Sequence, residues 1–295
     1  MFGVSAALTT PFNTDDSVDF GRLNDHIKTV LSDGCASVTF FGTTGEGASV
    51  ANNMQLETLR AAIDANITPE KFLLTLHGAA VADVVAQAKA ALQMGVRQFL
   101  LPPPCYFNDP TDQGLFNWFS NVLSQFNETP AKFILYHIPQ VIGVGLPIEL
   151  VRQLKTAYPD AVLGVKDSSG SFENTKKLLE LPDMQILVGD ERLLAEAVRL
   201  GASGAISGIA NLLAKRLSQV VANGKNDPAI NQLVDTVLQF PVTPAIKALV
   251  AHKYADNEWR RTMPPLVAVS DTDHQALARA YDLAAQGTNL ESDMK

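Results

Sequence analysis

The segment Val162–Gly170, VLGVKDSSG, joins a short apolar run to a polar end that closes on glycine. The run Val162–Lys166 has the length and branched apolar composition of a strand that is buried on both faces. The residues that follow, Glu173–Leu181, repeat their apolar positions with the period of a helix. This stretch therefore predicts a strand, a turn and a helix in succession, which is the repeating unit of parallel α/β folds.

The same unit recurs along the chain. The other predicted strands are Val4–Leu8, Ser37–Phe41, Phe72–Leu76, Gln98–Leu101, Phe133–Tyr136, Gln185–Val188 and Gly204–Ser207. The other helical segments are Phe20–Ser32, Met54–Asn66, Val81–Gln93, Gly114–Phe126, Ile148–Ala157 and Glu191–Leu200. The predicted helix N-caps are Asn53, Ser171 and Asp190, and the predicted helix stops are Gly34, Gly95 and Gly201. Eight strand–helix units in a row favour a closed (β/α)8 barrel, the TIM barrel, over a doubly wound sheet.

The chain after Leu212 loses the strand signal and has helical periodicity, interrupted by prolines such as Pro241 and Pro264. We expect residues 1–224 to form a catalytic barrel that includes its eighth helix. Residues 225–295 are expected to form a helical C-terminal extension. No linker-like or low-complexity stretch separates the two parts.

The composition excludes several classes of protein. The chain has 295 residues, of which 46% are hydrophobic and 18% charged, and its net charge is −8. It is typical of a globular protein and lacks the basic surface of nucleic-acid-binding proteins. No leader pattern and no apolar run long enough to span a bilayer is present. Cys35 and Cys105 have no metal-type spacing, so we expect two buried free thiols in a cytoplasmic protein without membrane or nucleic-acid partners.

Lys166 ends an otherwise apolar strand. In a parallel barrel the carboxyl ends of the strands meet at one face, and the active site is built there. Burial disfavours the charged ammonium and favours the free amine, which is the form that attacks a ketone to give an imine. A lysine paired with a barrel carboxylate, or one lying just clear of the core, is the alternative, and the strand pattern does not decide between them.

Other polar groups are predicted at the same face. Tyr136 ends the neighbouring strand, where a phenol can transfer protons, although a strand-end tyrosine is more often a core residue with a bonded hydroxyl. The loop Gly42–Gly47, GTTGEG, offers hydroxyl and N–H groups that suit a carboxylate, and it lacks the P-loop and dinucleotide-binding patterns. The histidines do not cluster at metal-ligand spacing, so no metal site is expected. Asp190 and Glu191 are interpreted as a helix N-terminus rather than an acid–base pair, although they could face a hydroxylated substrate.

Three motifs in order resemble those of the dihydrodipicolinate synthase / N-acetylneuraminate lyase family of pyruvate-dependent aldolases. They are Gly42–Glu46 (GTTGE), Tyr136–Pro139 (YHIP) and Gly164–Asp167 (GVKD). The resemblance runs from about Gly3 to Asn211, and the helical C-terminal segment also agrees with the pattern of the family. It implies a class I carbon–carbon lyase in which Lys166 forms a Schiff base with a 2-oxo acid, usually pyruvate, while an aldehyde is the second substrate. It implies no metal or organic cofactor, because the imine itself is the electron sink.

The resemblance also implies roles for single residues. Tyr136 would shuttle protons, with the Thr43 hydroxyl in its relay, and Thr44 would bind the substrate carboxylate. Tyr106 is similar to a tyrosine that completes the relay from a neighbouring subunit, which implies a homo-oligomer, either a dimer or the homotetramer common in the family. The other residues implied to form the substrate site are Gly42, Ser168, Gly189, Ile206 and Ser207.

Two positions depart from the family pattern. Members that make dihydrodipicolinate carry an arginine shortly after the tyrosine motif, whereas this chain has Val141 there and no arginine before Arg152. The missing charge-assisted pair, worth roughly 1.5–3 kcal/mol, counts against dihydrodipicolinate synthesis. His137 replaces the usual asparagine, with a consequence that the sequence does not reveal.

The expected substrate is a 2-oxo-3-deoxy sugar acid or a 4-hydroxy-2-oxo acid, because residues 166–170, KDSSG, resemble members that cleave such acids. Three alternatives stay open. They are a 4-hydroxy-tetrahydrodipicolinate (dihydrodipicolinate) synthase with a different carboxylate clamp, a 2-oxo-3-deoxy acid dehydratase that uses the same imine, and a non-catalytic metabolite-binding paralogue. The intact set of Lys166, Tyr136, Thr43 and Tyr106 counts against the last, because binding alone does not require a proton relay.

Overall fold

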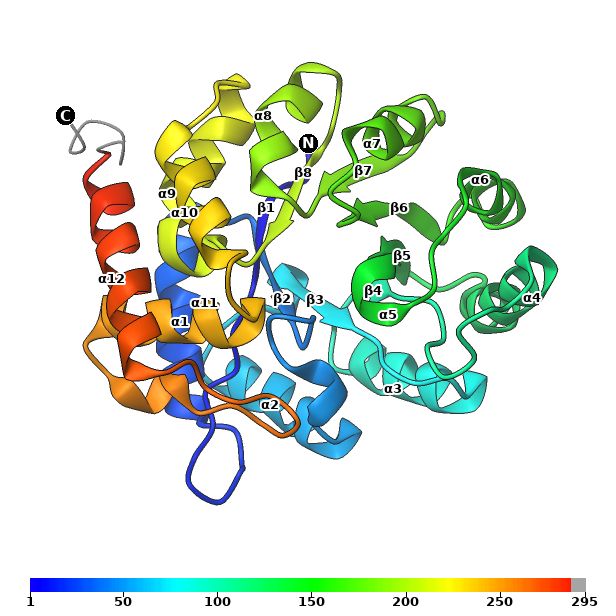
Figure 1. The fold of residues 1–295 in the computed structure, drawn as a ribbon. Helices are drawn as coiled ribbons and strands as arrows, with labels where there is room; N and C mark the ends of the chain where they lie inside the picture. The colour runs from blue at the N-terminus through cyan, green and yellow to red at the C-terminus, as the bar shows by residue number, and fades with distance from the viewer. Residues whose placement is uncertain (288–295) are drawn as a thin grey trace.

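The strands form one closed barrel in the order β1 to β8 (Figure 1), in a computed structural model that describes residues 1–287. Neighbouring strands are parallel, including β8 against β1. The strands are β1 (Gly3–Ala7), β2 (Ser37–Phe40), β3 (Phe72–Thr75), β4 (Gln98–Leu101), β5 (Lys132–His137), β6 (Val162–Asp167), β7 (Gln185–Val188) and β8 (Gly204–Ser207). The predicted TIM barrel is confirmed, and the strand ends differ from their predicted positions by no more than one residue.

Helices surround the barrel and alternate with its strands (Figure 1). They are α1 (Phe20–Ser32), α2 (Asn52–Asp64), α3 (Val81–Gln93), α4 (Asp112–Leu123), α5 (Pro139–Ile142), α6 (Ile148–Ala157), α7 (Phe172–Leu179), α8 (Glu191–Arg199) and α9 (Ala210–Asn223). Single turns of 3-10 helix lie at η1 (Gly47–Ser49), η2 (Pro69–Lys71) and η3 (Ser124–Phe126). Ser171 and Asp190 are N-caps as predicted, because their side chains accept from the backbone N–H groups of Asn174 and Arg192.

Two local predictions are wrong. Asn53 does not cap α2, because Ala51 already has the extended backbone of a cap residue and the helix begins at Asn52. Cys105 is exposed, although Cys35 is buried as predicted. The prolines at 102–104 prevent a helix or strand after β4 and lead the chain into the loop that carries Cys105.

Apolar side chains fill the barrel beneath the strand ends. Ala7, Leu73, Leu100, Ile134, Leu187 and Ile206 form a cluster that is separate from the larger core between strands and helices. This filling is typical of a TIM barrel, in which the interior is a packed core rather than a pore. The polar side chains at the strand ends therefore lie next to a layer of packed apolar side chains.

The C-terminal segment adds helices α10 (Pro228–Val237), α11 (Val242–Tyr254) and α12 (Asp271–Gln286), with a 3-10 turn η4 (Asn257–Arg260). They pack on α8, α9 and one another, and Figure 1 shows α10 in golden yellow, α11 in orange and α12 in red on the side of the barrel that carries α9. We propose that they extend the barrel from residue 225 onward; residues 288–295 of this predicted extension lie outside the described residues. Among residues 1–287, no helix is both long and apolar enough to cross a bilayer.

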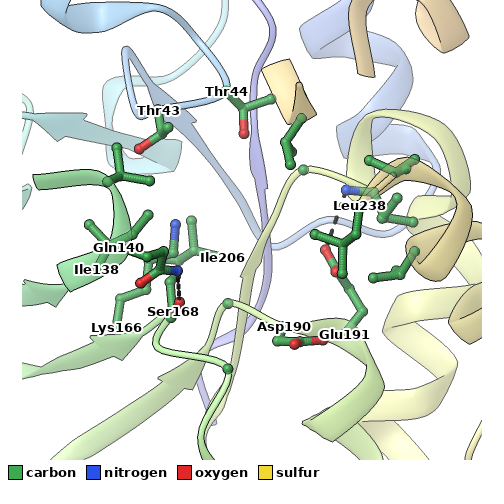
Figure 2. A pocket seen from close by; sticks show the side chains of 18 of the residues that line it. Thr43, Thr44, Ile138, Gln140, Lys166, Ser168, Asp190, Glu191, Ile206 and Leu238 are labelled. Carbon is green, nitrogen blue, oxygen red and sulfur yellow. Dashed lines mark hydrogen bonds between the residues drawn. The ribbon is translucent and has the colours of Figure 1, made fainter. Parts of the chain in front are cut away.

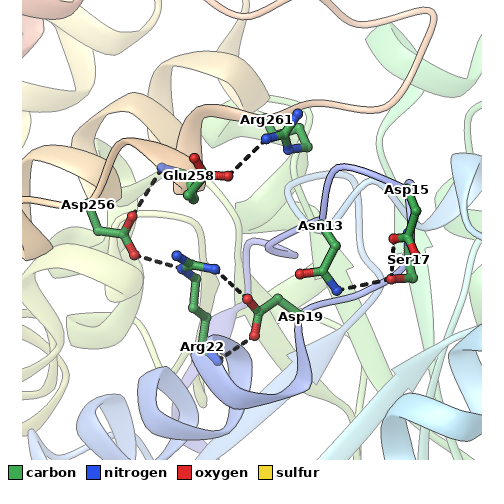
Figure 3. A network of polar contacts seen from close by, with 8 residues as sticks. All are labelled: Asn13, Asp15, Ser17, Asp19, Arg22, Asp256, Glu258 and Arg261. Carbon is green, nitrogen blue, oxygen red and sulfur yellow. Dashed lines mark hydrogen bonds and ion pairs between the residues drawn. The ribbon is translucent and has the colours of Figure 1, made fainter.

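Ion pairs connect this extension to the start of the chain (Figure 3). Arg22 of α1 pairs with Asp19 at the cap of its own helix, and its Nε donates to Asp256 beyond α11 at 2.7 Å. Glu258 of η4 in turn pairs with Arg261 at 2.8 Å. Because these side chains are partly exposed, each pair contributes little by itself. Of the three pairs, Arg22–Asp256 is the one that joins the extension to α1.

Candidate active site

A cavity of about 380 Å³ opens at the carboxyl ends of β5 to β8 (Figure 2). Its polar or glycine lining residues are Thr43, Thr44, Tyr136, Gln140, Lys166, Ser168, Ser169, Gly170, Gly189, Asp190, Glu191, Arg192 and Gly208. Its apolar lining residues are Ile138, Val141, Ile206, Ile209, Val234, Val237, Leu238, Val242 and Ile246. The barrel, α10 and α11 therefore all contribute to one site.

Lys166 and Tyr136 lie at paired positions on β6 and β5. Lys166 is buried, and its Nζ donates to the Tyr136 hydroxyl at 3.1 Å. Lys166 takes part in no ion pair among residues 1–287. The carboxylate of the next residue, Asp167, instead accepts from Asn174 and Thr175 of α7. The lysine thus faces the cavity with a phenol as its hydrogen-bond partner rather than a carboxylate.

The Tyr136 hydroxyl connects Lys166 with the loop after β2. It lies 3.4 Å from Thr43 Oγ1. Burial by itself would raise the pKa of the phenol, but the charge of Lys166 and hydrogen bonds from Thr43, Lys166 and Ser168 outweigh burial and lower it. A phenol whose pKa is lowered and whose hydroxyl has both hydroxyl and amine neighbours is suited to proton transfer.

The loop Gly42–Gly47 presents Thr43 and Thr44 to the cavity. No backbone hydrogen bond from the N–H of either threonine to another described residue is present. The backbone of Gly47 passes so close to Phe41 O that a Cβ there would lie 1.9 Å from that oxygen. The tight turn therefore requires glycine, and it presents the Thr44 hydroxyl and two backbone N–H groups to an anion, while the Thr43 hydroxyl lies next to Tyr136.

The remaining predicted site residues fall into two groups. Ser168, Gly189 and Ile206 line the cavity, whereas Gly42 and Ser207 do not. Gly189 allows close approach of the strand ends, because a Cβ there would lie 1.9 Å from Ser168 Oγ. Tyr106 lies outside the cavity of its own chain and is 82% exposed, next to Phe107, which is also exposed.

His137 forms a hydrogen bond with the backbone beyond the end of β5. Its Nδ1 accepts from the backbone N–H of Leu146 at 2.9 Å, which ties the end of β5 to the chain beyond α5. Burial lowers the pKa of His137, while the charge of Asp167 opposes that change. A neutral imidazole is the form that accepts at Nδ1, so the lowered pKa favours this bond. His137 therefore helps to position the loop that leads to Leu146.

Glu191 is the site residue that sequence reasoning undervalued. Its carboxyl group is enclosed at the start of α8, where Oε1 accepts from Ser207 Oγ at 2.5 Å and from Ile209 N at 3.4 Å. Burial raises the pKa of Glu191 despite these hydrogen bonds. Asp190, by contrast, caps α8 and pairs with Arg192 at 2.7 Å. The adjacent acidic residues thus have different environments, and the only signal for this in the sequence is their position after a predicted strand.

Chemically, the site combines an amine, a phenol with a lowered pKa, a neighbouring hydroxyl and an anion-binding turn. This set can form an imine with a 2-oxo acid and move the protons that imine formation requires. Among residues 1–287, no group of three or more His, Cys, Asp or Glu side chains could hold a metal ion.

Comparisons with known proteins agree on one family. The model of the dihydrodipicolinate synthetase family matches residues 1–283. A solved structure described as dihydrodipicolinate synthase from Agrobacterium tumefaciens str. C58 is 45% identical with a TM-score of 0.93, over 96% of this chain and 99% of that one. A Chloroflexus aurantiacus protein described as an uncharacterized DapA-like lyase is 30% identical over 97% of this chain and 98% of its own. At the level of the fold alone, a Sulfolobus solfataricus 2-keto-3-deoxygluconate aldolase variant matches with a TM-score of 0.83 at 19% identity, over 96% of each chain.

Proposed function

Because the chain belongs to the dihydrodipicolinate synthetase family, whose members are lyases that form a Schiff base with pyruvate, we propose that it makes or breaks the carbon–carbon bond between pyruvate and an aldehyde with Lys166 as the nucleophile. The proposed substrate is a 2-oxo-3-deoxy sugar acid or another 4-hydroxy-2-oxo acid. The observation that carries the proposal is the buried contact of 3.1 Å between Lys166 Nζ and the Tyr136 hydroxyl at the cavity floor.

The steps follow from this contact. The free amine of Lys166 attacks C2 of the 2-oxo acid, and Tyr136 supplies the proton with which the C2 oxygen leaves as water. The protonated imine then loses a proton from C3 and becomes an enamine. In the synthetic direction the enamine carbon attacks the aldehyde carbonyl, whose oxygen takes up a proton, and water hydrolyses the new imine to free the lysine. Cleavage is the same sequence in reverse.

Other residues are proposed to position the reactants. Thr44 would bind the carboxylate of pyruvate through its hydroxyl and N–H, because Thr44 lines the cavity and its N–H has no backbone acceptor among residues 1–287. The Thr43 hydroxyl would take part in the proton relay of Tyr136, from which it lies 3.4 Å away. Tyr106 is proposed to complete the proton relay in a second copy of the chain, since its exposed phenol lies outside the cavity of its own copy. On this proposal the active unit is at least a dimer.

The choice of substrate rests on Val141. This residue lines the cavity at the place where a clamp for a second carboxylate is expected, and valine offers no donor. Arg192 also lines the cavity, but its guanidinium already pairs with Asp190 at 2.7 Å and with Asp235 at 2.8 Å. Neither residue supplies a free cation for the carboxylate of aspartate semialdehyde.

Dihydrodipicolinate synthesis is the second candidate, because the structure that is 45% identical carries that description. Dehydration of a 2-oxo-3-deoxy acid, which would proceed through the same imine, is the third candidate reaction. A set of parallel assays separates the three: pyruvate release from 2-oxo-3-deoxy and 4-hydroxy-2-oxo acids, condensation of pyruvate with aspartate semialdehyde, and loss of water without pyruvate release. Efficient condensation with aspartate semialdehyde would overturn the substrate assignment.

The nucleophile is tested by trapping. Incubation with pyruvate and borohydride is expected to add one reduced pyruvyl group, which peptide mass spectrometry places on Lys166, since borohydride reduces an imine to a stable amine. The matched controls are Lys166→Arg, which cannot form the imine, and Lys132→Arg, which removes a lysine away from the cavity. A folded protein that gains no mass at Lys166 would refute the proposed function.

A further inference from the structure

Exposed apolar side chains gather at the mouth of the cavity. Among residues 1–287, the large hydrophobic residues that are exposed are Met1, Tyr106, Phe107, Val141, Leu200, Leu238, Val242 and Val267. Three of these, Val141, Leu238 and Val242, are 57%, 49% and 44% exposed and line the same cavity as Lys166. We call these three residues the apolar rim. Single exposed apolar residues are ordinary, but several around one pocket indicate a surface that an apolar ligand covers.

The rim comes from both sides of the opening. Val141 lies on α5 after β5, whereas Leu238 is the C-cap residue of α10 and Val242 begins α11. Figure 2 shows Leu238 across the cavity from Ile138 and Gln140. Buried apolar residues continue inward from the rim, with Val234 and Val237 on α10. The outer part of the cavity therefore has apolar walls that reach from the surface toward the strand ends.

Two polar side chains of the lining, Arg192 and Gln140, already have hydrogen-bond partners within the protein. Asp190 and Asp235 hold the Arg192 guanidinium, and Gln140 Nε2 donates to Ser168 O at 2.5 Å. A polyhydroxylated chain would have to replace these bonds, and each polar group left without a partner weakens its binding. An apolar chain leaves them intact.

The charges at the opening also favour an uncharged substrate group. The carboxyl groups of Asp190 and Glu191 line the cavity. Apart from Lys166, the basic side chain in the described lining is Arg192. Since Arg192 is paired with two carboxylates, the described residues that line the cavity offer no free cation for a second acidic group. A neutral aldehyde is favoured over one that carries a carboxylate.

We propose that the aldehyde half of the substrate carries an uncharged apolar group, alkyl or aryl, that the apolar rim covers, so that the full substrate is a 4-hydroxy-2-oxo acid with an apolar tail. The inference rests on the proposed function and narrows its substrate class. In the synthetic direction C3 of the enamine bonds to the aldehyde carbon, the aldehyde oxygen becomes the 4-hydroxyl by taking up a proton, and water releases the product from Lys166. The tail takes no part in bond making and contributes through burial against the rim.

The inference is tested with aldehydes of increasing length. Pyruvate consumption is measured with acetaldehyde, butanal and hexanal, with benzaldehyde, and with erythrose as the hydroxylated match for butanal. Each added methylene is expected to lower the KM for the aldehyde by about three- to ten-fold until the cavity is filled. Butanal is expected to have a higher kcat/KM than erythrose. A higher kcat/KM for erythrose, or a KM that does not change with chain length, would overturn the inference.

Variants of the rim provide the second test. Leu238→Asn and Val242→Thr are expected to raise the KM for hexanal several-fold more than the KM for acetaldehyde, while Val267→Thr, at an exposed valine outside the cavity, leaves both unchanged. If the rim variants instead change the oligomeric state by light scattering and leave the KM ratio as it was, the rim is a contact between copies and the inference is wrong.

Failure of the inference and failure of the proposed function are distinguishable. The borohydride adduct with pyruvate alone depends on Lys166 and not on the rim. If the adduct forms but hydroxylated aldehydes are preferred, only the substrate class is wrong. If no adduct forms, the Schiff-base function itself is wrong.

Discussion

Lys166 and Tyr136 are neighbours because their backbone positions are paired across β5 and β6. Their separation is therefore set by the sheet and not by flexible loops, which keeps amine and phenol at 3.1 Å before any substrate binds. Rigid placement of reacting groups is a large part of what an active site contributes to rate. At the scale of single residues, the site is defined by two side chains at paired positions near the ends of adjacent strands.

Replacement of the phenol tests this arrangement. Tyr136→Phe is expected to lower kcat by about 10²–10⁴-fold, because proton transfer to and from the carbinolamine loses its donor. The pKa of Tyr136 is lowered chiefly by Lys166 against the effect of burial, so an alkaline limb of the wild-type pH–rate profile should be absent in the variant. The matched control is Tyr158→Phe, which removes a phenol that bonds to Ser120 O. A loss of less than about tenfold would contradict the role of Tyr136.

Helix α11 holds the loop that carries Thr43 and Thr44. Thr243 and Lys247 lie one turn apart on this helix, so they face the same side. Thr243 Oγ1 donates to Thr43 O at 3.1 Å. Lys247 Nζ donates to Thr10 O at 2.8 Å and pairs with Glu46. One face of an element from the C-terminal extension thus fixes the turn after β2.

The Lys247–Glu46 pair is fully buried, with both side chains 0% exposed. Burial lowers the pKa of Lys247 to about 8, although the charge of Glu46 opposes that change. Glu46 also accepts from the backbone N–H of Met263 at 2.7 Å. The pair therefore connects three segments that are distant in sequence.

Removal of one partner is expected to be costly. Lys247→Met should lower the free energy of unfolding by roughly 3–5 kcal/mol, because it leaves the Glu46 carboxylate buried without a counter-charge. Addition of Glu46→Gln should restore part of that loss. Urea unfolding measures both, with Lys225→Met at an exposed position as the control. A Lys247→Met protein as stable as the control would show that the pair does not hold the loop.

At the scale of the whole molecule, a second buried polar network connects distant parts of the chain. His26 of α1 lies 2.8 Å from Tyr254 Oη through Nδ1 and 2.8 Å from Asn211 Oδ1 through Nε2. Asn211 Nδ2 donates to Ala7 O and Gly208 O, both at 2.7 Å. The network joins the first barrel strand, the eighth barrel helix and the C-terminal extension. A neutral ring satisfies both contacts, since Nε2 donates to the amide oxygen and Nδ1 accepts from the phenol.

Stability is expected to depend on pH through His26. Burial lowers the pKa of His26 in the folded protein to about 4, from 6.5. Between these values the unfolded chain binds more protons, so the stabilisation is complete above pH 6.5 and is lost as the pH falls toward 4, by roughly 3 kcal/mol in all. His26→Gln should unfold with a smaller dependence on pH in this window. Urea unfolding at several pH values, with His252→Gln as control, measures this, and an unchanged pH dependence in His26→Gln would contradict it.

Much of the fold could be predicted from local pattern. Short strands buried on both faces carry their own composition, and Ser171, Asp190 and the glycines that follow helices mark boundaries by backbone chemistry that acts within one turn. The polar residues at strand ends could be grouped because a parallel barrel brings all those ends to one face. Where a boundary depended on the preceding turn, as at Asn53, or exposure depended on the path of a loop, as at Cys105, the local pattern was insufficient.

The sequence by itself determined the barrel, the strand-end lysine and tyrosine, and the absence of an arginine at Val141, because each of these depends on residues close together in the chain. Only the tertiary structure decided which groups share the cavity. It encloses the carboxyl group of Glu191 at the start of α8 against Ser207 and Ile209, pairs Lys247 with Glu46, and places Leu238 and Val242 opposite Val141. Burial and the partners of a charge are properties of three-dimensional neighbours, and these neighbours lie about 100 or more residues away in the chain for the rim and the ion pair.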